Sequence, residues 1–135
     1  MKEYIFPIGT WVTENGKPLK VGVNEVIRQC HEETDYMPVI LSDRVKEMIG
    51  FKKADDTFVL TKWYDRKLVN VVLFDGKVSI TAIDKRSNDI IGTCTYRNII
   101  FLSQLQEMFH AASNEVLDVD LSSWDGSHGA LASCC

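Results

Sequence analysis

The sequence contains no long apolar run, and this absence limits the class of protein. No window approaches the roughly 20 consecutive apolar residues that a membrane-spanning helix needs. Glu3 and Pro7 interrupt the start before an apolar stretch forms, so we expect no signal peptide. With 45% hydrophobic and 25% charged residues, the composition is typical of a globular domain. We therefore predict a cytoplasmic protein that does not enter a membrane.

Closely spaced cysteine pairs are also missing. None of the four cysteines, at positions 30, 94, 134 and 135, forms the Cys-x-x-Cys pair of many zinc and redox sites. The adjacent Cys134 and Cys135 could bridge each other only with heavy strain. In a reducing compartment we expect Cys30 and Cys94 to be small apolar side chains. The pattern predicts no metal and no other cofactor.

Motifs for catalysis are not found either. The segment 30–35, "CHEETD", is rich in possible ligands, but no second Cys/His cluster accompanies it, so it is interpreted as a solvated acidic loop. The aspartates at 118, 120 and 125 lack the spacing of a calcium-binding loop. There is no Gly-x-Ser-x-Gly elbow, phosphate-binding glycine loop or dinucleotide fingerprint. We predict that the protein is not an enzyme, although its histidines, serines and cysteines leave a hydrolase-like site as an alternative.

Basic residues are absent after Arg97, and the charge is unevenly distributed along the chain. Residues 1–43 carry a net charge of −3, residues 44–97 carry +4, and residues 98–135 carry −5, which together give the net charge of −4. An acidic total argues against a protein that binds nucleic acid over its whole surface, because such proteins usually have a strong positive balance. The basic middle segment keeps local nucleic-acid binding open.

Turn and capping residues divide the first half into short elements. Asn15-Gly16 favours a type I′ turn, which predicts a hairpin over 10–21, and Pro18 places its second arm at a sheet edge or lies near the start of that strand. The apolar positions within residues 22–30 do not distinguish a helix from a strand, and this segment could continue as strand, whereas 31–38 is predicted to be a loop. Ser42 as the N-terminal cap and Gly50 as the left-handed stop predict a short helix between them.

The second half predicts a meander of at least four strands followed by a helix. Residues 57–64, 68–74, 77–83 and 90–96 are rich in β-branched and aromatic residues, and Asp75-Gly76 indicates a second type I′ hairpin. Ser103 and Gln106 have the spacing of a capping box. An apolar stripe along the same segment predicts a helix whose apolar face closes a core or, alternatively, fills a partner's groove. The stripe consists of Leu102, Leu105, Met108, Phe109 and Ala112. Residues 115–121 alternate like a last strand.

These elements predict an α+β fold, an antiparallel β-meander or partly closed barrel with two short helices packed on it. Residues 1–121 form the predicted single domain, and residues 122–135 a flexible C-terminal tail.

One segment combines aromatic and basic residues. In "KWYDRK", residues 62–67, two aromatic side chains are interleaved with cations, and two more cations follow in a nearby turn. Exposed aromatics on a sheet with surrounding cations can stack bases and hold phosphates. Alternation along the strand allows only one of the two aromatic side chains on each face. In the alternative interpretation one of them packs inward, and the charged side chains simply keep a turn in contact with water. The candidate binding residues are Lys62, Trp63, Tyr64, Arg66, Lys67, Lys85 and Arg86.

Three motifs occur in order along the chain: an Ile-Gly-x-x-Val strand at 8–12, a Pro-Val-Ile-Leu-Ser segment at 38–42 that leads a helix to Gly50-Phe51, and a Gln-Leu-Gln helix at 104–106. In these motifs the chain resembles short uncharacterised proteins of Bacteroides-type bacteria, their phages and conjugative elements. The histidine that usually begins this last motif is replaced by Ser103. The resemblance implies an accessory role in a bacterial cytosol. Our leading prediction is a small binding protein that acts on another protein, and the alternative is binding of single-stranded nucleic acid or a nucleotide.

Overall fold

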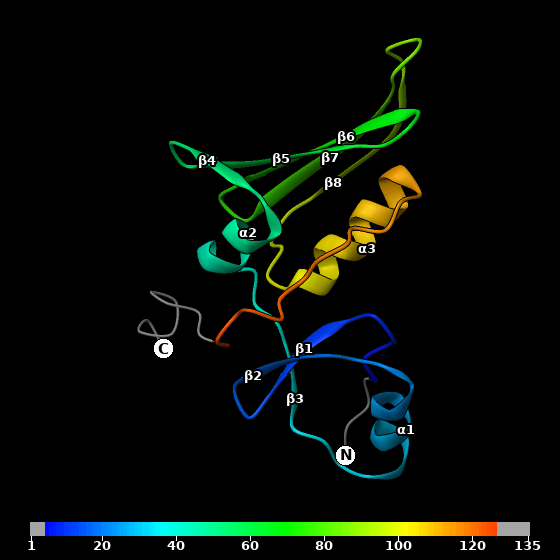
Figure 1. Cartoon of the computed structure of the whole chain (residues 1–135). Coiled ribbons are helices and arrows are strands. Elements are labelled where there is room, and N and C mark those ends of the chain that lie inside the picture. The colour runs from blue at the N-terminus through cyan, green and yellow to red at the C-terminus, as the bar shows by residue number, and fades with distance from the viewer. Residues whose placement is uncertain (1–4, 127–135) are drawn as a thin grey trace.

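The computed structural model of this protein describes residues 5–126, which form two antiparallel sheets and three helices. The smaller sheet has the strand order β2-β1-β3, from β1 (Trp11–Glu14), β2 (Lys17–Lys20) and β3 (Tyr36–Pro38), and helix α1 (Val23–His31) precedes β3. The larger sheet is an open meander in sequence order, from β4 (Lys52–Ala54), β5 (Thr57–Trp63), β6 (Lys67–Phe74), β7 (Lys77–Asp84) and β8 (Ile90–Tyr96). Helices α2 (Asp43–Ile49) and α3 (Leu102–Ser113) lie on one side of this meander (Figure 1). The predicted α+β class is therefore confirmed, as an open sheet and not as a barrel.

Both predicted hairpin turns are present. Asn15 and Gly16 join β1 to β2 with φ values of 53° and 80°, and Asp75 and Gly76 join β6 to β7 with 50° and 73°. These are the positive φ values that a type I′ turn requires. Pro18 lies in β2, an edge strand of the smaller sheet, where a missing backbone donor is tolerated.

The segment after this hairpin is helical, so the expectation of a continuing strand is wrong. Glu25 accepts a hydrogen bond from the Gly22 backbone N–H at 2.8 Å, which satisfies a free donor at the start of α1. The buried Gln29 side chain holds the backbone of Phe6 through two hydrogen bonds, of 2.8 and 3.0 Å. Helix α1 thus closes a small second core of Phe6, Val12, Val21 and Tyr36.

Helix α2 begins and ends where its capping residues predict. The Ser42 side chain accepts from the Val45 backbone N–H, and Gly50 ends the helix with a φ of 116°. Phe51 is buried directly after this stop.

Helix α3 begins at Leu102, so the predicted capping box of Ser103 and Gln106 is wrong. Gln104 accepts instead from the backbone N–H groups of Ile100 and Phe101, at 2.8 and 2.9 Å. The start of the helix is set by the segment before α2, because Phe101 bridges to Ile40 and Leu102 donates to Val39. The predicted apolar stripe packs into the main core, with Met108 partly buried.

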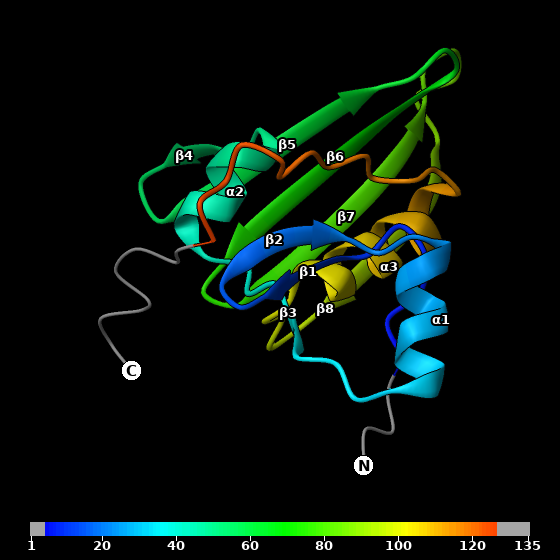
Figure 2. The same cartoon turned by 60° about the horizontal axis from the view of Figure 1, so that its bottom comes forward.

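The segment after α3 is extended but is not the predicted last strand. Leu117, Val119 and Leu121 are buried in alternation, as expected, yet the segment belongs to neither sheet. The Trp11 indole donates to the Val119 carbonyl at 2.8 Å, which ties this segment to β1, and Figure 2 shows it passing along the molecule beside α3 and α2. Trp124, in the predicted tail, is only 3% exposed and packs in the main core. Residues 127–135 of that tail lie outside the described residues.

Candidate binding face

The five-stranded sheet has one covered face and one open face. The covered face packs against α2, α3 and the C-terminal segment, while no helix or strand within residues 5–126 lies over the opposite face (Figures 1 and 2). We call this opposite face the open face. Strand alternation assigns to it the side chains of residues 52 and 54 of β4; 57, 59, 61 and 63 of β5; 68, 70, 72 and 74 of β6; 77, 79, 81 and 83 of β7; and 90, 93 and 95 of β8.

An apolar row crosses four strands at one end of the open face. Trp63 pairs with Leu68, Leu68 with Ile83, and Ile83 with Ile90. Trp63 is 68% exposed and Ile90 is 66% exposed, while Leu68 and Ile83 between them are partly buried. The row therefore presents four large apolar side chains to solvent side by side.

The next row is polar and uncharged. Thr61, Asn70, Thr81 and Thr93 are paired across the same four strands, and Thr61 donates to the Asn70 side chain at 2.9 Å. The outward-facing strand residues between 52 and 96 include two lysines, Lys52 and Lys77, and no carboxylate. The open face is thus weakly positive, although the whole chain is negative.

The structure brings together four of the seven predicted binding residues. Lys85 lies above the exposed ring of Trp63, with its ammonium nitrogen 5.8 Å from the ring centroid, which is within the range of a cation–π contact. Lys85 also donates its backbone N–H to the Arg66 carbonyl, so the β5–β6 and β7–β8 turns touch. Arg66 and Arg86 are exposed in these two turns. We call residues 64–66 and 84–89 the tip of the sheet.

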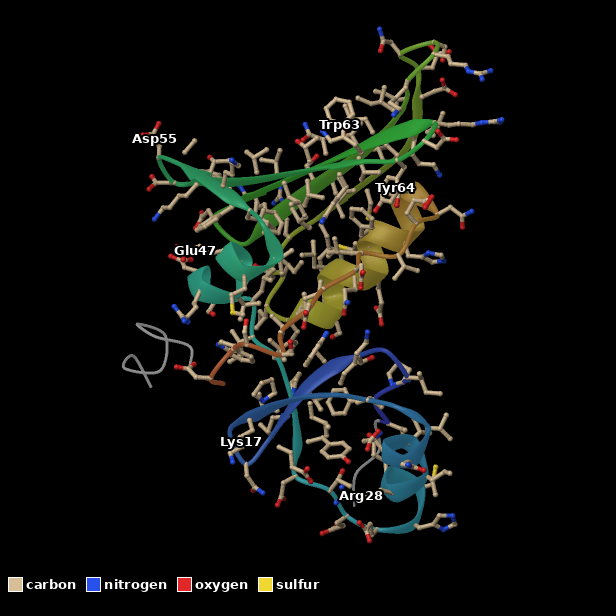
Figure 3. The ribbon with its side chains drawn as sticks, in the orientation of Figure 1. Lys17, Arg28, Glu47, Asp55, Trp63 and Tyr64 are labelled. Carbon is tan, nitrogen blue, oxygen red and sulfur yellow. The ribbon has the colours of Figure 1, made fainter. Side chains whose placement is uncertain are left out.

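The other three predicted residues belong to the covered face. Tyr64 is half-buried against the main core, and Figure 3 shows it on the side of α3, opposite to Trp63. Burial raises the pKa of the Tyr64 phenol, and the nearby carboxylates of Glu115 and Asp118 raise it further. Lys62 pairs with the buried Val69 and shares its face. The predicted set is therefore split between two faces.

Lys67 is held by the end of α3. Its ammonium group donates to the Ser113 carbonyl at 2.7 Å and lies 3.4 Å from a Glu115 carboxylate oxygen. A helix C-terminus favours a cation because its last carbonyls lack internal partners. Lys67 therefore joins the sheet to α3 and is not presented to a ligand.

The tip carries equal numbers of cations and carboxylates. Arg66, Lys85 and Arg86 stand beside Asp65, Asp84 and Asp89. The Asp84 carboxylate accepts from the backbone N–H groups of Arg86 and Ser87, at 2.8 and 3.2 Å. These two hydrogen bonds stabilise the charged carboxylate and lower the pKa of Asp84. Phosphate attraction at the tip is correspondingly weakened.

His31 and His110, which were considered for metal binding and catalysis, lie on different helices. Cys30 and His31 are exposed at the end of α1, and His110 is exposed on α3. Cys94, in β8, is partly buried. No group of three or more His, Cys, Asp or Glu side chains within residues 5–126 could hold a metal ion. His128, Cys134 and Cys135 lie outside the described residues.

A concavity of about 230 Å³ lies between α2 and the β4–β5 hairpin. The ammonium groups of Lys46 and Lys53 both lie over the Phe58 ring, with nitrogen-to-centroid distances of 4.5 and 5.6 Å. Lys46 is also paired with Asp43 at 3.5 Å, and Asp56 and Asp75 line the same concavity. Its cations are thus outnumbered by carboxylates.

The apolar row itself was missed by the sequence analysis, apart from Trp63. Leu68, Ile83 and Ile90 become neighbours of Trp63 only through the strand register, which is set by the two-residue turn at Asp75-Gly76 and by a register shift between Ala82 and Ile83. Residues 77–83 alternate, which indicates their buried and exposed sides, but residues 68–74 are apolar on both sides, so nothing in that run indicated that Leu68 faces outward.

Comparison with protein-family models finds no match to this chain, and comparisons with curated proteins and with solved structures find none either. No helix within residues 5–126 is both long enough and apolar enough to cross a membrane.

Proposed function

We propose that this chain is a non-enzymatic binding protein that docks another protein on the open face. The observation that carries the proposal is the apolar row of Trp63, Leu68, Ile83 and Ile90, whose end residues are 68% and 66% exposed. Adjacent exposed apolar side chains, as opposed to scattered ones, mark interaction surfaces. Tryptophan is also enriched among the residues that contribute most to binding free energy.

Charge complementarity defines the chemistry of the partner. Lys52, Lys77 and Lys85 lie on or beside the open face, whose outward strand residues carry no carboxylate. A partner surface with an apolar centre and an acidic rim would cover the row and face these lysines. Such charges at an interface rim accelerate association and select the partner, whereas the apolar centre supplies most of the affinity.

The setting of this function follows from the resemblance to proteins of Bacteroides-type bacteria, their phages and conjugative elements. It supports an accessory role in the host cytosol, in which the partner is a host or element protein. The weakly positive open face on an otherwise negative chain is consistent with a dedicated partner surface.

The experiment has two stages. A photo-crosslinking amino acid placed at Thr61, beside the row, identifies the partner in the native host, and the same amino acid at Cys30 on α1 is the control site. The affinity of the purified partner is then measured for Trp63→Ala and Ile90→Ala, and we expect each to weaken binding about tenfold or more. Ile27→Ala is the matched control, because Ile27 is also an exposed isoleucine, at 51%, and lies on α1. Equal affinities for the Ile90 and Ile27 variants would overturn the proposal, as would crosslinking that is equal at both sites.

Binding of single-stranded nucleic acid is a second candidate, favoured by the Lys85 ammonium group above the exposed Trp63 ring. Trp63 is the exposed indole within residues 5–126, since Trp11 and Trp124 are buried, so base stacking would be reported by its fluorescence. An oligonucleotide titration at two salt concentrations tests this candidate, with Trp63→Phe as the control. Quenching that weakens steeply with salt supports nucleic-acid binding over protein docking.

A further inference from the structure

The two edge strands of the five-stranded sheet differ in their protection. The edge strand β4 has three residues, two of which are lysines, and such short charged edges discourage pairing with another chain. The opposite edge strand, β8, has seven residues, Ile90–Tyr96, with no charge and no proline. Such an edge presents backbone donors and acceptors that a further strand can use.

We propose that β8 pairs antiparallel with β8 of a second copy of this chain, about a two-fold axis through Cys94. In this register Gly92 lies opposite Tyr96 of the second copy, Thr93 lies opposite Thr95, and Cys94 lies opposite itself. The axis of an antiparallel pair is perpendicular to the sheet, so the two meanders join into one continuous sheet. Both open faces then lie on the same side, and both copies of α3 lie on the other.

The cross-strand pairs of this register are complementary. Gly92 is the point where α3 lies directly against β8, because an added Cβ would collide with the Ala112 carbonyl of α3. Tyr96 is 53% exposed at the other end of this regular stretch, so its ring is available to contact the second copy. Thr93 and Thr95 are both exposed on the open face and are well suited to strand pairing.

The charges at the two ends of β8 also favour self-pairing. Asp89 precedes the strand and Arg97 follows it, and both are exposed. In an antiparallel pair the start of one strand lies near the end of the other, so Asp89 of each copy approaches Arg97 of its partner. Parallel pairing would instead place like charges together, which disfavours it.

The bulge in β8 selects the register. Ala82 pairs with Gly92 and Ile83 with Ile90, so Ile91 is an extra residue and regular pairing runs from Gly92 to Tyr96. The midpoint of this regular stretch is Cys94. A concavity of about 190 Å³, lined by Tyr96 and by Gln104, Glu107 and Met108 of α3, opens beside the same strand and leaves room for the second copy.

A charge-swap pair of variants tests the register directly. Thr93→Lys with Thr95→Lys places two lysine–lysine pairs across the dimer, whereas Thr93→Lys with Thr95→Glu places two lysine–glutamate pairs there. Sedimentation equilibrium of the full chain, at up to about 100 µM because a small interface is weak, is expected to show a dimer for the wild type. We expect the dissociation constant of the dimer to rise about tenfold or more in the lysine–lysine variant. The lysine–glutamate variant should dimerise again.

Crosslinking supplies an independent readout. In a background with Cys30, Cys134 and Cys135 replaced by serine, mild oxidation should join Cys94 to Cys94 of the second copy. A matched chain with Cys94→Ser and Ala54→Cys carries its one thiol on the other edge, β4, and should remain monomeric. The proposal is overturned if the wild type stays monomeric throughout the concentration range. It is also overturned if the two double variants dimerise equally while their thermal unfolding is unchanged. This outcome leaves the open-face function intact, because the row residues are tested separately.

Discussion

The two faces of the five-stranded sheet are made by the same strands but have different roles. On the covered face Val69, Val71, Ile80 and Ala82 are completely buried beneath the helices and the C-terminal segment. On the open face Trp63 and Ile90 are mostly exposed, and a polar row with a threonine in three of its four positions lies beside them. The comparison teaches that residue type alone does not separate core from surface in this sheet. What decides is which alternate residues of each strand point away from the helices. An apolar residue on the covered face stabilises the fold, and one on the open face is available to a partner.

The largest expected contrast is in stability. Phe109 of α3 is completely buried against the covered face, so Phe109→Ala should lower the free energy of unfolding by about 3–5 kcal/mol through lost burial and a cavity. Trp63→Ala on the open face should lower it by less than about 1 kcal/mol, because that side chain remains in contact with water. Urea denaturation followed by far-ultraviolet circular dichroism measures both. Similar losses for the two variants would show that the open face is also part of the core.

A smaller effect is expected where α3 approaches the sheet. An added methyl group at Gly92 would meet the Ala112 carbonyl, so Gly92→Ala should destabilise the protein by about 1–3 kcal/mol. Thr93→Ala, one residue further on the open face, is the matched control and should cost less than about 1 kcal/mol. Thermal unfolding of both variants sharpens the comparison, and a neutral Gly92→Ala would mean that α3 can move away from β8 freely.

A third contrast concerns two lysines of the same sheet. Lys67→Met removes the hydrogen bond to the Ser113 carbonyl and the ion pair with Glu115, and we expect a loss of about 1 kcal/mol. Lys77→Met on the open face should change the stability by less than about 0.5 kcal/mol, because Lys77 is exposed. Denaturant midpoints of the two variants decide the matter, and equal midpoints would show that Lys67 does not stabilise the docking of α3.

The smallest expected effect is the pH dependence of the tip. The pKa of Asp84 in the folded protein is lowered from its ordinary value of 3.8, mainly by the backbone N–H groups of Arg86 and Ser87. Its contribution to stability is therefore present above that ordinary value and is lost as the pH falls through the lower folded pKa. Asp84→Asn should reduce the loss of stability in acid, whereas Asp89→Asn removes a charge from the same turn without removing these bonds. Thermal unfolding between pH 7 and about pH 2.5 measures the difference.

The sequence predicted those elements whose ends are encoded locally. Ser42 and Gly50 mark α2 correctly, and Asn15-Gly16 and Asp75-Gly76 mark both hairpins, since each relies on the conformational preference of one or two residues. Helix α1 was missed because its start is a glycine whose N–H is satisfied by Glu25, and because its one buried residue is the polar Gln29. The segment therefore has no stripe of buried apolar residues that would have predicted a helix.

The candidate site was predicted only in part, for a similar reason. Alternation indicated that Trp63 and Tyr64 lie on opposite faces, but it did not indicate which face was open. Lys67 was counted as a binding residue because Ser113, which accepts its hydrogen bond, is 46 residues away in the chain. The other members of the apolar row were overlooked because they become neighbours only through strand pairing.

By itself, the sequence determined the class of fold, the turns and the α2 boundaries, because these depend on interactions between residues close together in the chain. The tertiary structure alone decided where α3 begins, that the segment after it lies in the core without joining a sheet, and which face of the meander stays uncovered. These features depend on contacts between distant segments, such as the bridge from Ile40 to Phe101 and the hydrogen bond from Trp11 to Val119. The free energy of these contacts comes from surface that both segments bury together, so the sequence of one segment does not specify the contact.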